Sequence, residues 1–181
     1  MSLISSVYIA TSLDGFIARE NDDLDWLDAA NATVPEGEDC GYQDFMSSVD
    51  ALVMGRSSYE KVLSFGAWPY DKPVTVLSRN SLDIPAAISH RVFHSNETPA
   101  ALHQRLSQQG VRRLYVDGGI TIQRFLSAGL IDDITITVIP VILGSGKPLF
   151  GPLEKDIALR HVATKTYDCG FVQSTYTVIK T

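Results

Sequence analysis

Apolar residues along the chain fall into two patterns, short continuous runs and runs with helical spacing. The continuous apolar run Ala51–Met54 is consistent with a buried strand, and segments rich in β-branched and apolar residues predict further strands at about Leu3–Ala10, Pro73–Leu77, Arg91–His94 and Arg112–Val116. Apolar residues three and four positions apart, together with capping and proline signals, predict helices at Asp39–Val49, Ser57–Leu63, Pro99–Gln108 and Ile120–Ser127. The aspartate-rich segment Glu20–Asp28 shows neither pattern and is expected to be a loop.

The pattern changes after Asp132, where longer strands are expected. Ile134, Ile136 and Val138 alternate with threonines, and two further strands are predicted at Ile157–Tyr167 and Phe171–Lys180. A chain that first alternates strands with helices and then ends in antiparallel strands predicts an α/β fold with one mixed, mostly parallel sheet and helices on both faces. No repeat or linker interrupts the pattern, so one domain over residues 1–181 is expected.

Composition narrows the possible partners. The 181 residues carry a formal net charge of −6, which disfavours DNA or RNA, because binding to nucleic acid relies on clustered Lys and Arg. No apolar run is long enough to span a membrane. Two cysteines, Cys40 and Cys169, form neither a disulfide framework nor a metal-ligand spacing. These features favour a cytoplasmic protein without membrane attachment.

Three glycine-bearing junctions follow predicted strands: Asp14-Gly15, Gly55-Arg56 and Gly118-Gly119. Ligands of open α/β sheets bind at the carboxyl ends of strands, where helix N-termini offer free N–H groups to anions. Gly118-Gly119 fits a pyrophosphate seat, although a plain chain reversal is the more frequent explanation of such a pair. The G-x-G-x-x-G fingerprint, the Walker A loop and the G-x-S-x-G nucleophile elbow are all absent.

Serine and arginine occur together after two predicted strands, at Arg56 to Ser58 and at Ser78-Arg79. Two such pairs could clamp a phosphate monoester such as the 2′-phosphate of NADPH. Either arginine taken alone is more often a surface residue. No metal site is expected, because the aspartates of the Glu20–Asp28 segment lack the order of a calcium loop and the four histidines are scattered.

Taken in order, four motifs resemble the dihydrofolate reductase superfamily. They are Ile9-Ala10-x-Ser12-x-Asp14-Gly15-x-Ile17, Val53-Met54-Gly55-Arg56-x-x-Tyr59-Glu60, Val76-Leu77-Ser78-Arg79 and Gly118-Gly119. The later segment Ile139–Phe150 is similar to the bacterial branch related to the C-terminal reductase domain of riboflavin biosynthesis. The resemblance implies a three-layer αβα fold, an NADPH-dependent reductase and a homodimer.

The resemblance also implies roles for particular residues. The nicotinamide would lie against Ala10 and Ile17, and the phosphates against Gly55, Arg56 and Ser58, with Arg56 on the 2′-phosphate. The adenosine side would lie against Ser78 and Arg79. The pyrophosphate would bind at Gly118, Gly119, Ile120 and Thr121. Trp26 matches the tryptophan that closes the Asn21–Asp28 loop over the substrate.

The catalytic acid is expected on the first helix, where Asp39 is favoured and Asp44 is its rival for contact with the substrate. The role requires a buried carboxylate with a raised pKa, or one that pairs with ring N–H donors. An exposed acid near a helix N-terminus explains either residue about equally well. The loop pattern of true folate enzymes is missing, so the substrate class extends from pterins to riboflavin-precursor pyrimidines or an unrelated carbonyl compound.

Three functions therefore remain open. The first is hydride transfer from NADPH to a C=N or C=O carbon of a flat heterocycle, with Asp39 as anchor or proton source. The second is an inactive NADP(H)-binding or regulatory homodimer. The third is a structural homodimer whose strands around Ile134–Ile142 and Val172–Ile179 serve mainly as an interface.

Overall fold

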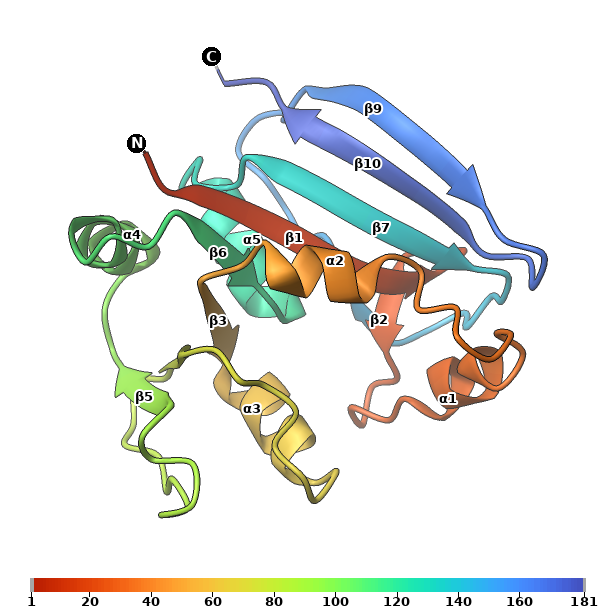
Figure 1. Cartoon of the computed structure of the whole chain (residues 1–181). Helices are drawn as coiled ribbons and strands as arrows, with labels where there is room; N and C mark the ends of the chain where they lie inside the picture. The colour runs from red at the N-terminus through yellow and green to blue at the C-terminus, as the bar shows by residue number, and fades with distance from the viewer. Residues whose placement is uncertain (1, 181) are drawn as a thin grey trace.

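The computed structural model describes residues 2–180 and contains one large sheet with helices on both faces (Figure 1). The strands of this sheet are β1 (Ile4–Ser12), β3 (Ala51–Gly55), β4 (Val74–Leu77), β5 (Val92–Ser95), β6 (Arg113–Val116), β7 (Asp133–Ile139), β9 (Leu159–Thr166) and β10 (Val172–Val178). A separate two-stranded sheet pairs β2 (Phe16–Ala18) with β8 (Lys147–Pro148). The helices are α1 (Asp25–Asn31), α2 (Tyr42–Ser47), α3 (Arg56–Leu63), α4 (Pro99–Gln108) and α5 (Gly119–Ser127).

The strand order of the large sheet is β5-β4-β3-β6-β1-β7-β10-β9. Every pairing from β5 to β7 is parallel, whereas β10 is antiparallel to β7 and to β9. This arrangement confirms the predicted mixed, mostly parallel sheet with antiparallel C-terminal strands. Within residues 2–180, no helix has the length and apolar character that a membrane crossing requires.

Alternation along the strands divides the apolar side chains between two cores. Val7 and Val53 pack into a cluster with Leu102 of α4 and Phe125 of α5 on one face. Leu52, Met54 and Tyr8 point to the opposite face and pack with Tyr59 of α3 and Phe45 of α2, while Trp26 of α1 lies in a third cluster. The central strands are buried on both sides, which is why they appear in the sequence as continuous apolar runs.

Two predictions about the first 50 residues were wrong. Part of the expected Glu20–Asp28 loop is α1, and Arg19 Nε donates to Asp25 at 2.5 Å while Lys147 pairs with Asp22, so ion pairs hold this segment. The helix expected from Asp39 begins only at Tyr42. Cys40 has φ +56° and Gly41 has φ +81°, and left-handed residues do not continue a right-handed helix.

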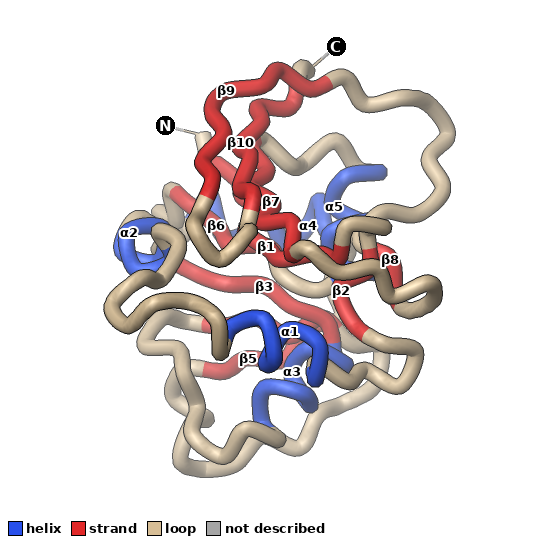
Figure 2. The backbone as a smooth tube through the Cα atoms, turned by 90° about the vertical axis from the view of Figure 1, so that its right-hand side faces the viewer, coloured by secondary structure: helices blue, strands red, loops and turns tan. Residues whose placement is uncertain are grey.

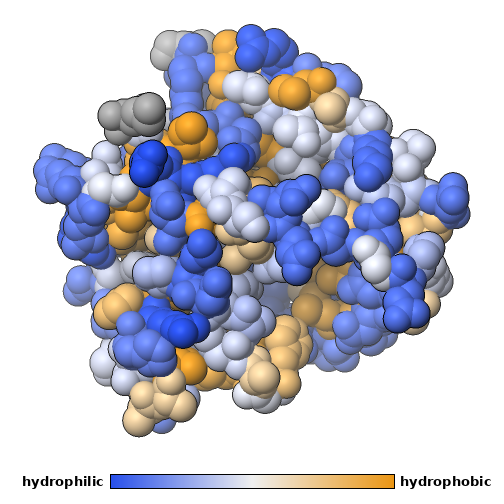
Figure 3. Space-filling model, in the orientation of Figure 1, coloured by the Kyte–Doolittle hydropathy of each residue, from blue (hydrophilic) through white to orange (hydrophobic). Residues whose placement is uncertain are grey.

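Two further views of the chain show which helices and loops surround the carboxyl ends of the central strands. Figure 2 places α1 and α3 below the central strands, with the loop before α2 running beside them. On the surface, Figure 3 shows a hollow below α2 and between α1 and α3. The carboxyl ends of the parallel strands lead to this region.

Candidate active site

The glycine-bearing junctions lie in a row at the carboxyl ends of the central strands. Gly55 ends β3, Ser78 follows β4, Gly118 follows β6, and Ser12 ends β1. These four strands are neighbours in the order β4-β3-β6-β1, and all are parallel. Parallel neighbours place their carboxyl ends on the same side, so residues far apart in the sequence meet in a single row.

The glycines of this row lie where a side chain would not fit. A Cβ on Gly118, which has φ +88°, would collide with Ser58 Oγ, and a Cβ on Gly55 would lie 3.0 Å from Thr121 Oγ1. A Cβ on Gly119 would lie 2.9 Å from Ile17 Cδ1. Six residues assigned to cofactor binding therefore lie together: Ile17, Gly55, Ser58, Gly118, Gly119 and Thr121. This cradle of closely packed glycine backbone at the N-terminus of α5 is suited to a pyrophosphate.

The remaining cofactor candidates surround this cradle. Arg56 begins α3, is half exposed, and donates from Nε to Glu60 Oε1 at 2.8 Å. Ser78 and Arg79 follow the next strand, and the backbone oxygen of Ser78 is 2.8 Å from His94 Nε2. Ile120 is 71% exposed on the first turn of α5. Arg56 and Arg79 are exposed to solvent at the carboxyl ends of β3 and β4, on the same side of the sheet as the cradle. Their roles in binding stay predictions.

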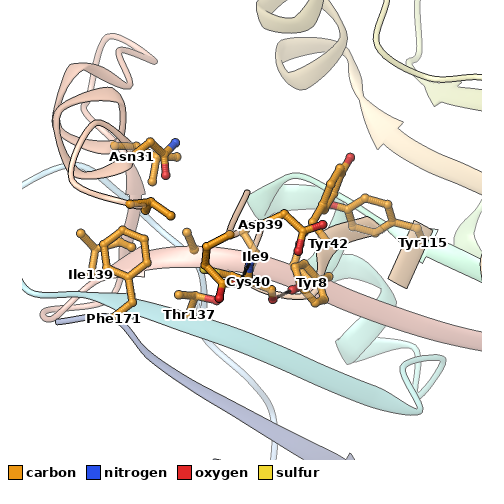
Figure 4. A pocket seen from close by; sticks show the side chains of 14 residues that line it. Tyr8, Ile9, Asn31, Asp39, Cys40, Tyr42, Tyr115, Thr137, Ile139 and Phe171 are labelled. Atoms are coloured by element: carbon orange, nitrogen blue, oxygen red, sulfur yellow. Dashed lines mark hydrogen bonds between the residues drawn. The ribbon is translucent and has the colours of Figure 1, made fainter. Parts of the chain in front are cut away.

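A cavity of about 470 Å³ opens next to Ala10, between β1, α1, α2 and the start of β10 (Figure 4). Its aromatic lining consists of Tyr8, Tyr42, Tyr115 and Phe171. Its aliphatic lining consists of Ile9, Ala10, Leu27, Val34 and Ile139. Its polar lining consists of Asn31, Glu38, Asp39, Cys40 and Thr137. Flat walls and few polar groups suit a planar ring.

The floor of this cavity is a closed hydrogen-bond network. Gln173 Nε2, with its two hydrogens, lies within hydrogen-bond distance of three acceptors: the Tyr8 hydroxyl at 3.0 Å, Thr137 Oγ1 at 2.9 Å and the backbone oxygen of Cys40 at 2.9 Å. The Tyr8 hydroxyl also donates to the Cys40 oxygen. Burial raises the pKa of Tyr8 to about 12, so this phenol stays neutral at physiological pH.

Asp39 lies at the cavity wall, as expected for an acid that contacts the substrate, but its environment differs from the prediction. It precedes α2, is exposed, and accepts the N–H groups of Gln43 at 2.8 Å and Gly41 at 2.9 Å. These N–H groups lower the pKa of Asp39, so it is not a buried acid with a raised pKa. Asp44 is exposed on α2 and is not among the residues that line the cavity.

A carboxyl group with a raised pKa lies directly before the glycine pair, at Asp117. Burial raises its pKa to about 6, although its oxygen accepts the N–H of Gly118 at 2.9 Å. Burial also raises the pKa values of Tyr42 and Tyr115, and the charge of Asp117 raises both further. Asp117 does not line the cavity itself, but it lies directly before the glycine cradle and its charge acts on two phenols that do line the cavity.

Trp26 is 5% exposed and packs with Ile139 and Phe171, two residues of the cavity wall. It does not line the cavity itself, whereas its neighbours Leu27 and Asn31 on α1 do. Its indole nitrogen is buried and has no hydrogen-bond partner within residues 2–180. Direct contact of Trp26 with a substrate stays a prediction, and its observed position supports the wall from behind.

Comparison with protein families decides the ancestry of this fold and site. A family model described as the RibD C-terminal domain matches residues 6–173. The chain belongs to this family. Two curated relatives from Bacillus subtilis (strain 168) are the uncharacterized protein YwjB, 40% identical over 89% of this chain and 90% of the relative, and the uncharacterized protein YyaP, 28% identical over 93% and 91%.

Solved structures place the RibD C-terminal domain fold over the whole molecule. A putative riboflavin biosynthesis protein from Shewanella sp. PV-4 superposes with a TM-score of 0.92 at 40% identity, over 98% of this chain and 100% of the other. A deaminase/reductase from Thermotoga maritima superposes with a TM-score of 0.75 at 14% identity, over 98% of this chain and 57% of the other, which compares the fold alone. The fold is therefore dihydrofolate reductase-like, as the resemblance implied.

The residues that sequence reasoning missed in this RibD-family site share one property. Asp117, Tyr115 and Gln173 gain their importance from burial and from partners distant in the sequence. One local signal was available, because Asp117 immediately precedes the glycine pair that was already assigned to the cofactor.

Proposed function

We propose that this RibD-family chain is an NADPH-dependent reductase that transfers hydride to a flat heterocyclic or carbonyl substrate. The observation that carries the proposal is the glycine cradle at Gly55, Gly118 and Gly119, which adjoins an aromatic-walled cavity. Ala10 lines that cavity, and Ile17, its proposed partner at the nicotinamide, packs on Gly119. The proposed dinucleotide site and the proposed ring-binding cavity would thus both be reached from β1 and the loop that follows it.

The chain offers suitable groups for each part of the cofactor. The N–H groups at the N-terminus of α5 and the hydroxyls of Ser58 and Thr121 would bind the pyrophosphate. Arg56 and Arg79, at the ends of two neighbouring strands, would bind the 2′-phosphate. The exposed Arg56–Glu60 ion pair is worth only about 0.5 kcal/mol, so it would yield readily to a phosphate. When bound, NADPH supplies the hydride.

Reduction of a C=N or C=O bond also requires a proton on the heteroatom. Asp117, whose pKa burial raises to about 6, holds a proton over a higher pH range than an ordinary carboxyl group. Asp39 stays ionised because of its N–H partners and would accept hydrogen bonds from ring N–H donors. The two acids would then divide the work, with Asp117 as proton source and Asp39 as anchor.

The names of the structural neighbours agree with this chemistry. The Thermotoga maritima protein is described as a diaminohydroxyphosphoribosylaminopyrimidine deaminase/5-amino-6-(5-phosphoribosylamino)uracil reductase. A neighbour from Corynebacterium diphtheriae, with a TM-score of 0.68 and 17% identity, is described as pyrimidine reductase-like. Both support a reductase function for the present chain.

The test is titration of the purified protein with NADPH and NADH, followed by nicotinamide fluorescence. We expect selective binding of NADPH that weakens about 10- to 100-fold in Arg56→Ala, because a charged hydrogen bond to phosphate is lost. The binding of NADH should change little. Arg112→Ala removes an equal charge from an exposed position elsewhere and serves as the control. Absence of binding by either nucleotide would refute the proposal, and binding without turnover of any carbonyl or heterocycle would favour a regulatory protein.

A further inference from the structure

The cavity that adjoins the glycine cradle contains negative but no positive side chains. Of the fourteen residues within 2–180 that line it, none is Lys, Arg or His. Glu38 and Asp39 are its ionisable acids, and both are exposed at the mouth. Glu38 accepts the N–H of Cys40 at 2.8 Å, and Asp39 accepts two further N–H groups, so the backbone fixes both carboxylates in place.

The basic side chains closest to the cavity's elements already have partners of their own. Arg113 bonds Ser6 and Asp133 and lies 5.6 Å from the centroid of the Phe45 ring. Lys165 lies 4.7 Å from the centroid of the Tyr167 ring on the β9–β10 hairpin. Its charge is a minor influence on the pKa of Asp39, which is lowered first by the N–H groups of Gln43 and Gly41. Nothing in this arrangement prepares the cavity for an anion.

A phosphomonoester carries a charge of about −1.5 to −2 at neutral pH and is bound in proteins by Arg, Lys or free N–H groups. The N–H groups available to an anion lie in the first turn of α5, which the proposed function assigns to the cofactor. At the aromatic-walled cavity, the N–H groups of Cys40, Gly41 and Gln43 are occupied by Glu38 and Asp39. A phosphate placed there would meet two carboxylates and no basic side chain among the lining residues within 2–180.

We infer that the cavity accepts an unphosphorylated planar ring compound, either neutral or positively charged, and rejects phosphomonoesters. Insofar as this compound is the substrate of the reductase, the inference rests on the proposed function. It separates this chain from the reaction named for the Thermotoga maritima neighbour, whose aminouracil carries a phosphoribosyl group. The present chain shares that fold and differs in the substrate charge that its cavity admits.

Three probes with the same ring and different charges test the inference: 2-naphthol, 2-naphthylmethylammonium and 2-naphthyl phosphate. Each is titrated into the full-length protein with and without saturating NADPH, and binding is followed by naphthyl fluorescence. We expect the neutral and cationic probes to bind at least about tenfold more tightly than the phosphate. Equal or tighter binding of the phosphate, or no binding of any probe, would overturn the inference.

A matched pair of variants separates the cavity from the overall negative charge of the protein. Glu38→Lys should bring the affinity for 2-naphthyl phosphate to or above that for the ammonium probe. Glu36→Lys makes the same change of net charge in the same loop, outside the cavity lining, and should leave the preference unchanged. Equal effects of the two variants would attribute the selectivity to the net charge of −6 and overturn the inference.

The same titrations distinguish failure of this inference from failure of the proposed function. Tight NADPH binding combined with a preference for the phosphate probe would retain the reductase and reject the charge selectivity. A preference for neutral and cationic probes without any NADPH binding would retain the selectivity and reject the reductase. As a check with a relevant compound, 5-amino-6-(5-phosphoribosylamino)uracil should support little NADPH oxidation compared with its dephosphorylated form.

Discussion

At the scale of single residues, Asp117 is a carboxylic acid whose pKa is raised by burial, in the turn between β6 and α5. It follows β6 and accepts the N–H of Gly118, yet burial outweighs this bond and raises the pKa of its carboxyl group to about 6 from 3.8. The charge of Asp117 in turn raises the pKa values of three nearby phenols, those of Tyr42, Tyr70 and Tyr115. A carboxyl group in this situation destabilises the folded protein when it ionises.

This residue therefore predicts a pH dependence of stability. The pKa of Asp117 is higher in the folded than in the unfolded protein. The stability that its protonated form contributes is therefore fully present below about pH 4 and is lost as the pH rises through about 6. We expect Asp117→Asn to resist urea better than the wild type at about pH 8, by up to about 3 kcal/mol, and no better at about pH 4. Asp71→Asn changes an exposed carboxylate and should show no such trend. A pH-independent difference for Asp117→Asn would contradict the assignment.

At the scale of elements, Gln173 connects β10 to three other parts of the site. Its amide reaches Tyr8 on β1, Thr137 on β7 and the carbonyl of Cys40 in the loop that carries Asp39. We expect Gln173→Leu to lower the free energy of unfolding by about 1–3 kcal/mol, because buried acceptors lose their donor. Denaturant unfolding measures this change, and the binding of 2-naphthol should weaken with it.

The control for this prediction is Gln104→Leu, which makes the same substitution at an exposed position of α4 and should shift stability by less than about 0.5 kcal/mol. Equal losses in both variants would indicate a general cost of an added leucine. In that case the network around Gln173 would not be what holds the Asp39 loop against the sheet.

Elements were predictable from the sequence where burial leaves a continuous or periodic pattern. Strands such as β3 and β6 are buried on both faces and show as apolar runs, and α4 carries its Thr98 cap and proline. The helix α1 has seven residues, no side-chain cap and only Trp26 buried, so its sequence contains little helical signal. The strands β2 and β8 have three and two residues and depend on pairing with each other.

The site was predictable to the extent that it depends on glycine. Gly55, Gly118 and Gly119 mark positions where backbones approach closely, and this need is visible in the sequence. The raised pKa of Asp117 and the lowered pKa of Asp39 depend on burial and on N–H partners that form only in the folded chain. Reasoning from residue type alone therefore could not tell that the pKa of Asp39 is lowered and that of Asp117 is raised.

At the scale of the whole molecule, the two edges of the sheet differ in a way that bears on assembly. At one edge, β5 is four residues long and its two end residues are buried. At the other edge, all eight residues of β9 are exposed, and Val162 and Leu159 are apolar residues 56% and 41% exposed. Long exposed edge strands readily pair with another chain unless they are protected. The surface around β9 and β10 thus suits a second copy of the chain.

We therefore expect a homodimer formed about a two-fold axis through the β9–β10 surface. Sedimentation velocity should give a mass near twice 19.8 kDa for the wild type and near 19.8 kDa for Val162→Asp, because a charge would be buried at the interface. Phe93→Asp places the same charge on a residue 49% exposed in β5, at the opposite edge, and should remain dimeric. A monomeric wild type, or a Val162→Asp variant as dimeric as Phe93→Asp, would exclude this surface. Since Tyr167 and Phe171 join β9 and β10 to the cavity wall, a dimer at this surface would also place the second copy close to the mouth of the site.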